Sequence, residues 1–301
     1  MVTRRDFLRL SGAAAGTAAL TAVGAEPAEA RPLVDSGRIG VLVDATQCIG
    51  CRRCEYACAV ENDLPHEELS AYDDTSVLGE MRRPDAEAYT VINRYSPPSY
   101  SDQPLDLKIN CLHCDHPACV SACIVGALEK NPLGPVTYDA WKCIGCRYCM
   151  IACPFQIPAY EYANATTPRV MKCNLCAERT LAEGKPPACV EICPRECLVF
   201  GKRSELVKLA HRRIRENPDR YHPEIYGEHT AGGTSWLYLA DRPLTELDLP
   251  DLPDESPAEI TESIQHGIFR GFSGPIMLFG LMSVLMKSSG DKRKEKEDDH
   301  A

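Results

Sequence analysis

Hydrophobic and polar residues along this chain predict a unit of strand, loop and short helix that occurs more than once. In Val41–Cys58 and again in Val136–Cys153, a short β-branched run precedes a cysteine-rich loop, and a helix-prone segment follows the loop. Eleven of the eighteen positions are identical between the two stretches. Residues 111–123 and 173–193 repeat the plan in degenerate form. An internal repeat of this kind indicates two modules of two units each.

The segments outside the repeats carry different patterns. An amphipathic helix is predicted over Ser204–Asn217, and a strand over Trp236–Leu239 lies between a Gly-Gly turn and an acidic, proline-rich linker. The 52 residues of Ala59–Asn110 form an insertion rich in polar residues, tyrosine and proline. We expect this insertion and the extension after residue 202 to pack against a partner subunit. Neither contains a nucleophile with its base, or a phosphate-binding glycine loop, so we expect no catalytic site.

The N-terminus has the order of features typical of an export signal. Arg4 and Arg5 precede Phe-Leu, an Ala/Gly-rich apolar region and a small-residue site that ends at Ala30. The paired arginines resemble a twin-arginine signal, which would occupy residues 1–30. The basic region of an ordinary secretory signal is the alternative. The distinction matters because the twin-arginine route exports proteins already folded around their cofactors.

The C-terminus carries a second membrane signal. Gly271–Met286 has no charged residue, and counted from His266 the stretch gives 21 residues, or about 31 Å of helix. This length matches the ~30 Å hydrocarbon core of a bilayer. A transmembrane helix is therefore predicted at 263–287, and the basic residues behind it predict a charged cytoplasmic tail at 288–301. A buried helix of a soluble domain is the alternative.

Composition narrows the classes of function. The net charge of −10 argues against a nucleic-acid-binding protein, which would normally present a basic surface. The chain has 17 cysteines among 301 residues, far more than a disulfide-free globular protein of this size normally carries. The cysteines could form a disulfide framework or bind metal, and their spacing has to decide between the two.

Sixteen of the cysteines fall into four quartets. The quartets are Cys48, Cys51, Cys54 and Cys58; Cys111, Cys114, Cys119 and Cys123; Cys143, Cys146, Cys149 and Cys153; and Cys173, Cys176, Cys189 and Cys193. In the run C-x₂-C-x₂-C-x₃-C-P, three thiolates bind one iron–sulfur cluster and the fourth reaches the other cluster of a pair. Each quartet is therefore a half-site, and quartets must occur in pairs.

Zinc sites and disulfides fit this spacing less well. Zinc sites use two separated C-x₂-C pairs and need no x₃-C-P tail, and disulfides between cysteines so close in a loop or helix are geometrically awkward. The seventeenth cysteine, Cys197, aligns with Ala127 and is expected to pack rather than to bind metal. His113 and His116 lie inside the second quartet, where a Rieske-type ligation by histidine is the alternative. All four cysteines are present there, so we expect both histidines to be solvent-facing or sulfur-neighbouring loop residues.

With these motifs, the chain resembles the four-cluster ferredoxin-like electron-transfer subunits of respiratory oxidoreductases, such as those of dimethyl sulfoxide reductase and formate dehydrogenase. The likeness covers about residues 38–202, through CIGCRRCEYAC, CLHCDHPACVSAC, CIGCRYCMIACP and CNLC…CVEICP. The twin-arginine start, YGEHTAGGTSWLYL, TELDLPDL and SIQHGIFRGF are similar to the exported, membrane-anchored ferredoxin-like subunit of uptake nickel–iron hydrogenases.

The resemblance implies an α+β fold of two bacterial-ferredoxin-like 4Fe–4S modules with loop and strand insertions, plus one C-terminal transmembrane helix. The double module would span 31–202, with the insertion at 59–110, and a partner-contacting extension and linker would span 203–262. The implied ligand sets, four 4Fe–4S clusters in all, are Cys48, Cys51, Cys54 and Cys193; Cys173, Cys176, Cys189 and Cys58; Cys111, Cys114, Cys119 and Cys153; and Cys143, Cys146, Cys149 and Cys123. Ala59 and Ile124 replace the usual proline after two of the quartets, but proline ligates nothing.

The function implied by the resemblance is electron relay rather than catalysis. Electrons would pass between a catalytic subunit, of the nickel–iron hydrogenase type, and a quinone-reactive integral membrane subunit at the periplasmic face of the membrane. A molybdopterin enzyme, or a sulfur- or tetrathionate-type reductase, is the alternative catalytic partner. A zinc-binding structural or regulatory protein is the alternative of a different class, which iron and sulfide analysis would separate.

Overall fold

The three-stranded sheet at the centre of the body is built on β1 (Ile39–Asp44). A computed structural model describes residues 37–96, 103–247, 249–259, 261–264, 274, 276–284 and 286–287. In it, β1 pairs antiparallel with β8 (Leu198–Lys202) and parallel with β9 (Trp236–Leu239). Residues 41–43, Val-Leu-Val, are fully buried, as expected for a central strand covered on both faces. The sheet thus joins the start of the first repeat to segments far along the chain.

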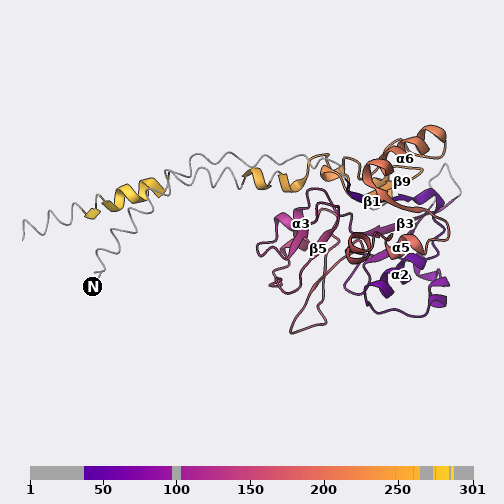
Figure 1. The fold of residues 1–301 in the computed structure, drawn as a ribbon, viewed down its shortest axis with the longest axis horizontal. Helices are drawn as coiled ribbons and strands as arrows, with labels where there is room; N and C mark the ends of the chain where they lie inside the picture. Colours follow the sequence, from indigo (N-terminus) through magenta and orange to yellow (C-terminus); the bar gives the residue numbers. More distant parts are fainter. Residues whose placement is uncertain are drawn as a thin grey trace, which may run out of the picture. The chain divides into compact units, whose positions relative to one another are not determined.

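Different layers cover the two faces of this sheet. On one face, α6 (Arg203–Glu216) packs Leu206 and Ala210 against Leu42 and Leu237. On the other face, Val41, Val43 and Trp236 belong to the main hydrophobic core, which also contains cysteines. Figure 1 shows α6, β9 and β1 lying together. One side of the sheet is therefore closed by an ordinary helix, and the other faces the cysteine-rich interior.

The insertion contributes a buried hairpin to the body. β2 (Thr90–Tyr95) and β3 (Leu105–Asn110) pair antiparallel, and all six residues of β3 are buried. The hairpin is fastened to α2 (Arg53–Glu61) by the buried carboxylate of Glu55, which accepts hydrogen bonds from the Ile92 N–H at 2.6 Å and from Arg82 Nη2 at 2.6 Å. Contact of this segment with a partner stays a prediction; within the chain itself, the segment supplies part of the core.

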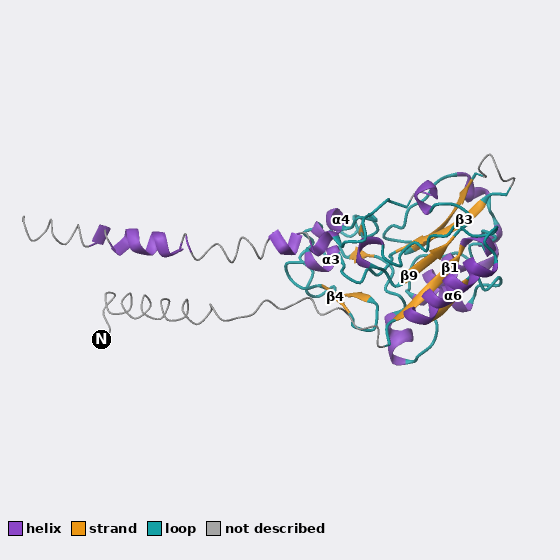
Figure 2. Ribbon diagram, turned by 90° about the horizontal axis from the view of Figure 1, so that it is seen from above, coloured by secondary structure: helices purple, strands orange, loops and turns teal. Residues whose placement is uncertain are grey.

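The helices that carry the third cysteine of each quartet pack in pairs. α2 packs against α5 (Ala188–Glu191), and α3 (Ala118–Ser121) packs against α4 (Tyr148–Ala152). Figure 2 shows α3, α4 and β4 gathered away from α6, β1 and β9. Two short antiparallel pairs accompany α3 and α4, namely β4 (Leu128–Lys130) with β5 (Val136–Tyr138), and β6 (Ala159–Tyr160) with β7 (Val170–Met171). The first quartet is thus joined to the fourth, and the second to the third.

Short helical turns connect these elements. The 3-10 turns are η2 (Ala45–Gln47), η3 (Leu69–Asp73), η4 (Ser76–Gly79), η6 (Thr230–Gly232) and η7 (Leu244–Leu247), and η5 (Glu178–Ala182) is a π-helical turn. The strand predicted over Trp236–Leu239 has those bounds, and the helix predicted over Ser204–Asn217 begins and ends one residue earlier. The mixture of helix and sheet agrees with the expected α+β class.

The expected membrane segments fall largely outside the described residues. The signal at 1–30 and the tail at 288–301 lie wholly outside them, as do parts of 263–287. Within the part of the chain that the structure describes, no helix combines the length and the apolar character needed to cross a membrane.

Candidate iron–sulfur centres

Left-handed residues shape the cysteine loops of the repeated unit. Gly50 and Arg52 have φ of +65° and +57°, and the equivalent Gly145 and Arg147 have φ of +71° and +61°. This conformation reverses the chain within a few residues, so thiols separated by two intervening residues face one space. It also turns amides inward: the Gly145 N–H lies 3.4 Å from Cys143 Sγ. The loops therefore present thiols and N–H donors together.

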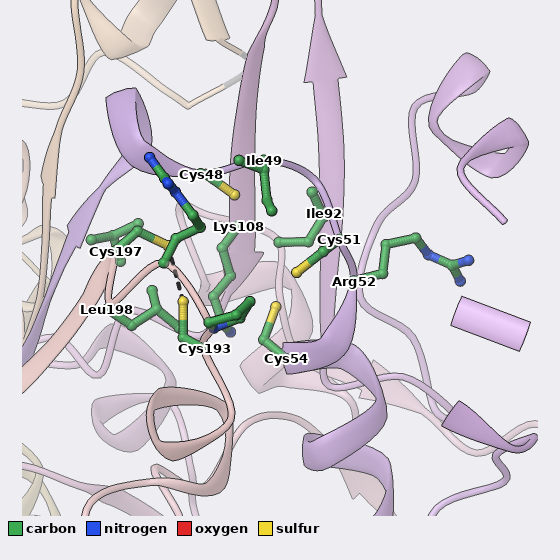
Figure 3. A pocket seen from close by; sticks show the side chains of 13 residues that line it. Cys48, Ile49, Cys51, Arg52, Cys54, Ile92, Lys108, Cys193, Cys197 and Leu198 are labelled. Atoms are coloured by element: carbon green, nitrogen blue, oxygen red, sulfur yellow. Dashed lines mark hydrogen bonds between the residues drawn. The ribbon is translucent and has the colours of Figure 1, made fainter. Parts of the chain in front are cut away.

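The first group of thiols lines a small cavity. Group 1 consists of Cys48, Cys51, Cys54 and Cys193, all of which line that cavity. Figure 3 shows their sulfurs turned toward a common space, with Lys108 beside them. Three come from the first quartet and one from the fourth, brought together because β1 and β8 are neighbouring strands.

Cys197 lies against this group as a fifth thiol. Its Sγ is 3.4 Å from Cys193 Sγ, and it is buried in the main core. The hydrogen bond from Cys197 lowers the pKa of Cys193 to about 5, against the opposing effect of burial, and the pKa of Cys197 is raised. The hydrogen bond between the two sulfurs therefore favours the proton on Cys197. It packs, as its alignment with Ala127 indicated, and it also donates to a neighbouring sulfur.

Group 2 gathers the other end of the first quartet. It consists of Cys58, Cys173, Cys176 and Cys189. Burial and then the nearby thiols of Cys173, Cys189 and Cys176 raise the pKa of Cys58 well above its ordinary value. Cys54 and Cys58 stand one helical turn apart on α2, so this single helix supplies thiols to groups 1 and 2.

Groups 3 and 4 share the second and third quartets in the same manner. Group 3 consists of Cys111, Cys114, Cys119 and Cys153, and burial together with the other three thiols raises the pKa of Cys114. Group 4 consists of Cys123, Cys143, Cys146 and Cys149, and here burial and then the other three thiols raise the pKa of Cys149 to about 11. In both groups the implied partners are electrostatic neighbours of these thiols, and the assignment of the ligand sets stays a prediction.

Electrostatic interactions between thiols of different groups indicate which groups are neighbours. Cys54 of group 1 is close enough to Cys189 of group 2 for their charges to interact. Cys173 of group 2 interacts in the same way with Cys111 of group 3, and Cys119 of group 3 with Cys149 of group 4. Group 1 therefore neighbours group 2, group 2 neighbours group 3, and group 3 neighbours group 4.

The donor set fits iron–sulfur clusters. Each group offers four thiols, the soft ligands that such clusters take. Backbone N–H groups reach sulfur at Cys123 (3.1 Å, from Ala127) and at Cys173 (3.4 Å, from Leu175), and such bonds stabilise negative charge on sulfur. The thiols of group 1 line a cavity. Among the described residues, no three or more His, Cys, Asp or Glu side chains could hold a single metal ion.

A buried lysine lies between groups 1 and 2. Lys108, on β3, is 2% exposed, and its Nζ donates to Thr90 Oγ1 at 2.5 Å and to Asn110 Oδ1 at 3.0 Å. Burial alone would lower its pKa, but thiols of both groups, Cys189 and Cys54 foremost, raise it. Nothing in the sequence pattern signals this role, because a lysine within a polar insertion resembles a surface residue. It places a permanent positive charge beside two groups that bind anionic clusters.

His113 is a second residue whose surroundings only the structure decides. It is fully buried, so of the two expected settings the solvent-facing one is excluded for His113, whereas His116 is partly exposed beside Glu259. Burial, followed by the charges of Lys172, Lys130 and Lys108, lowers the pKa of His113 well below its ordinary value. The imidazole therefore stays neutral in the interior, within the loop that carries Cys111 and Cys114.

Comparison with known proteins identifies the family to which the chain is similar. Residues 107–203 match the family described as 4Fe-4S dicluster domain. The chain is 33% identical over 344 residues to the hydrogenase-2 operon protein HybA of Escherichia coli O157:H7, covering 99% of both chains. It is 33% identical over 261 residues to the formate dehydrogenase-O iron-sulfur subunit of E. coli (strain K12), covering 83% of this chain and 81% of that protein. A protein of Nitratidesulfovibrio vulgaris is 46% identical over 299 residues, 97% of this chain and 78% of its own length.

The chain belongs to the iron–sulfur electron-transfer subunits of respiratory oxidoreductases. It carries multiple 4Fe–4S clusters and moves electrons within a complex, and the catalytic site belongs to another subunit. The clusters supply one-electron redox chemistry when bound. The chain's own residues hold them with thiolates, direct N–H groups at sulfur and exclude water from the interior.

Proposed function

We propose that the four groups of thiols hold four 4Fe–4S clusters, and that electrons pass along them in the order 1, 2, 3, 4 or its reverse. The support is the row of neighbouring groups, in which each group is next to the following one. Helix α2 spans groups 1 and 2, and the pair α3 and α4 spans groups 3 and 4. A relay needs closely spaced centres, and helices shared between centres provide that spacing.

The catalytic partner in this proposal is a subunit of the nickel–iron hydrogenase type. The observation that carries it is the match to HybA over 99% of both chains, which includes the C-terminal part beyond the cysteines. The formate dehydrogenase subunit matches over 83% of this chain. A molybdopterin partner is the second candidate, since that relative is equally identical within the aligned part.

The two ends of the row favour docking of partners. In group 4, Cys146 is exposed, and apolar side chains stand in solvent around the loop, with Ile144 at 61% and Ile151 at 81% exposure. Group 1 lines a cavity to which Ile49, half exposed, also contributes. Large exposed apolar side chains that surround a redox centre are typical of a surface that a partner covers.

The proposed location is the periplasmic face of the cytoplasmic membrane, reached by the twin-arginine route. The proposal includes a single C-terminal anchor with the tail in the cytoplasm, next to a quinone-reactive membrane subunit. Support comes from the described helical residues 276–284, which carry no charge and include Ile276, Phe279 and Leu281 at 58% exposure or more. Such side chains are stable in lipid.

The deciding experiment is anaerobic co-purification of the complex. We expect about sixteen irons and as many sulfides per chain, since each cluster holds four of each, and hydrogen-dependent reduction of a dye. Recovery of a molybdopterin subunit without hydrogen-dependent reduction would replace the hydrogenase partner by the second candidate. Zinc in place of iron would reject the relay.

A reporter fused to the C-terminus tests the topology separately. A reporter that is active only in the cytoplasm should be active when it is fused to the C-terminus of the full chain. A chain that ends after residue 262 should release its cluster-bearing body from the membrane fraction in the absence of its partners. A reporter active only in the periplasm would contradict the proposed anchor.

A further inference from the structure

The fully buried imidazole of His113 accepts a hydrogen bond at one ring nitrogen and, within the described part of the chain, has no partner at the other. The backbone N–H of Val136, the first residue of β5, donates to Nδ1 at 2.8 Å. Nε2 has no hydrogen-bond partner among the residues that the structure describes, and the ring is 0% exposed. Buried polar atoms in proteins nearly always have a partner, so an unpartnered one indicates a group that binds there.

The bond at Nδ1 decides which nitrogen carries the proton. A backbone N–H can only donate, so Nδ1 must offer its lone pair. The neutral ring then carries its hydrogen on Nε2. The free atom is therefore a donor, and it requires an acceptor.

Further contacts of the loop fix the ring in place. The backbone of His113 has φ of +52°, and its carbonyl accepts hydrogen bonds from Ser235 N–H at 3.2 Å and from Lys130 Nζ at 3.2 Å. The charged groups that act on the ring are Lys172, Lys130 and Lys108, which are all cations and cannot accept. His113 stands between Cys111 and Cys114, two thiols of group 3. The loop also carries the buried Asp115 carboxylate, which faces Arg38 at 2.7 Å and Lys130 at 3.7 Å. Sulfur is therefore the acceptor that this loop leaves for the Nε2–H.

We propose that His113 donates its Nε2–H to a sulfur of the cluster held by group 3, and that this bond raises the reduction potential of that cluster. The inference rests on the proposed ligand set of group 3. Reduction adds negative charge to the cluster, and an N–H directed at sulfur stabilises the reduced state more than the oxidised one. His113 acts in this way as a positioning residue that tunes one centre of the relay.

Two substitutions distinguish the acceptor role of Nδ1 from the donor role of Nε2. His113→Asn keeps an acceptor near the position of Nδ1, tolerates the left-handed backbone and loses the distal donor. His113→Gln carries an amide N–H at about the reach of Nε2. His116→Asn is the matched control, because it makes the same change in the same loop at a partly exposed ring.

The measurement is a redox titration of the anaerobically purified complex, followed by EPR. With His113→Asn, we expect the ratio of reduced to oxidised group 3 cluster at a fixed potential to fall about tenfold, which equals about 59 mV for a one-electron couple. His113→Gln should restore part of the shift, and His116→Asn should leave the potential unchanged. An unchanged potential in His113→Asn, or a shift confined to another cluster, overturns the proposal.

A second measurement does not depend on whether the His113 variant assembles. In the wild-type complex with ¹⁵N-labelled histidine, pulsed EPR of the reduced group 3 cluster should detect one histidine nitrogen with an exchangeable proton, and the same signal in His116→Asn. Absence of that coupling overturns the inference even if His113→Asn does not assemble. Iron content tests the ligand set independently: a full complement of clusters without the coupling rejects the role of His113 and leaves the relay intact.

Discussion

At the scale of single residues, neighbouring cysteines in similar surroundings have different roles. Cys193 and Cys197 stand four residues apart and touch through their sulfurs at 3.4 Å. Both line the same cavity, and the pKa of Cys193 is lowered to about 5, first by the hydrogen bond from its neighbour. Its neighbour keeps the proton. The proposed ligand, Cys193, completes the spacing of the fourth quartet, whereas Cys197 lies outside all four quartets.

Substituting the two cysteines separately tests this distinction. Cys193→Ala should lose one cluster, seen as a loss of about a quarter of the iron and of one EPR signal, because group 1 then has three thiols. Cys197→Ala should retain all the iron and shift the potential of group 1 downward, because the S–H donor is removed. Equal iron loss in both variants would make Cys197 a ligand.

Lys108 is the residue whose charge should matter most to the relay. Lys108→Met keeps the length and apolar stem of the side chain but removes the cation beside groups 1 and 2. We expect both potentials to fall by roughly 60 mV, equivalent to about 1.4 kcal/mol for one electron. Lys208→Met, at an exposed lysine on α6, is the control and should change neither potential. Unchanged potentials in Lys108→Met would contradict the proposed effect of the lysine charge and would leave the thiols and backbone N–H groups as the source of the potentials.

At the scale of elements, close approach of backbones holds the central sheet together. A Cβ atom at Gly40 of β1 would overlap the backbone oxygen of Ser235, which accepts the Val41 N–H at 2.9 Å. That oxygen is fixed by its hydrogen bond and cannot move without breaking the pairing of β1 with its neighbour. A glycine is therefore required at this position by contact rather than by backbone angle.

Gly40→Ala should accordingly destabilise the body. We expect a loss of about 1–3 kcal/mol in the free energy of unfolding, the usual cost of overpacking. Gly79→Ala, where nothing lies within 4 Å of the added Cβ, should change it by little. Chemical denaturation of the cluster-loaded protein measures both, and an equal effect of the two substitutions would contradict the predicted overlap.

At the scale of the whole molecule, two kinds of interior coexist. The layer between the sheet and α6 is an ordinary apolar core of residues such as Leu42, Leu206 and Leu237. The opposite interior is lined by thiols, and burial raises the pKa of many of them, so ionised sulfur is stable there only with a cation or a cluster. The second interior thus depends on its cofactors.

Removal of iron should destabilise the thiol-lined interior more than the apolar layer under α6. After treatment with chelator and oxidant, we expect amide hydrogen exchange to accelerate by at least tenfold in α2 and α5, whose thiols lose their bonds. The layer of α6 against β1 should keep more of its protection, because its contacts are apolar. Uniform loss of protection in both regions would show a single cooperative unit instead.

Local sequence was sufficient to predict the sixteen candidate ligands, the strand at Trp236–Leu239 and the helix near Ser204–Asn217, because each depends on spacing or periodicity within a few residues. It also indicated that quartets pair, since x₃-C-P spacing sends the fourth thiol away from the first three. Long-range packing was needed to establish the order of the groups in space, the core role of the hairpin inside 59–110, and the burial of Lys108 and His113. These depend on which distant strands and helices meet, β1 with β8 and α2 with α5, and a buried lysine or histidine has the same letter as an exposed one.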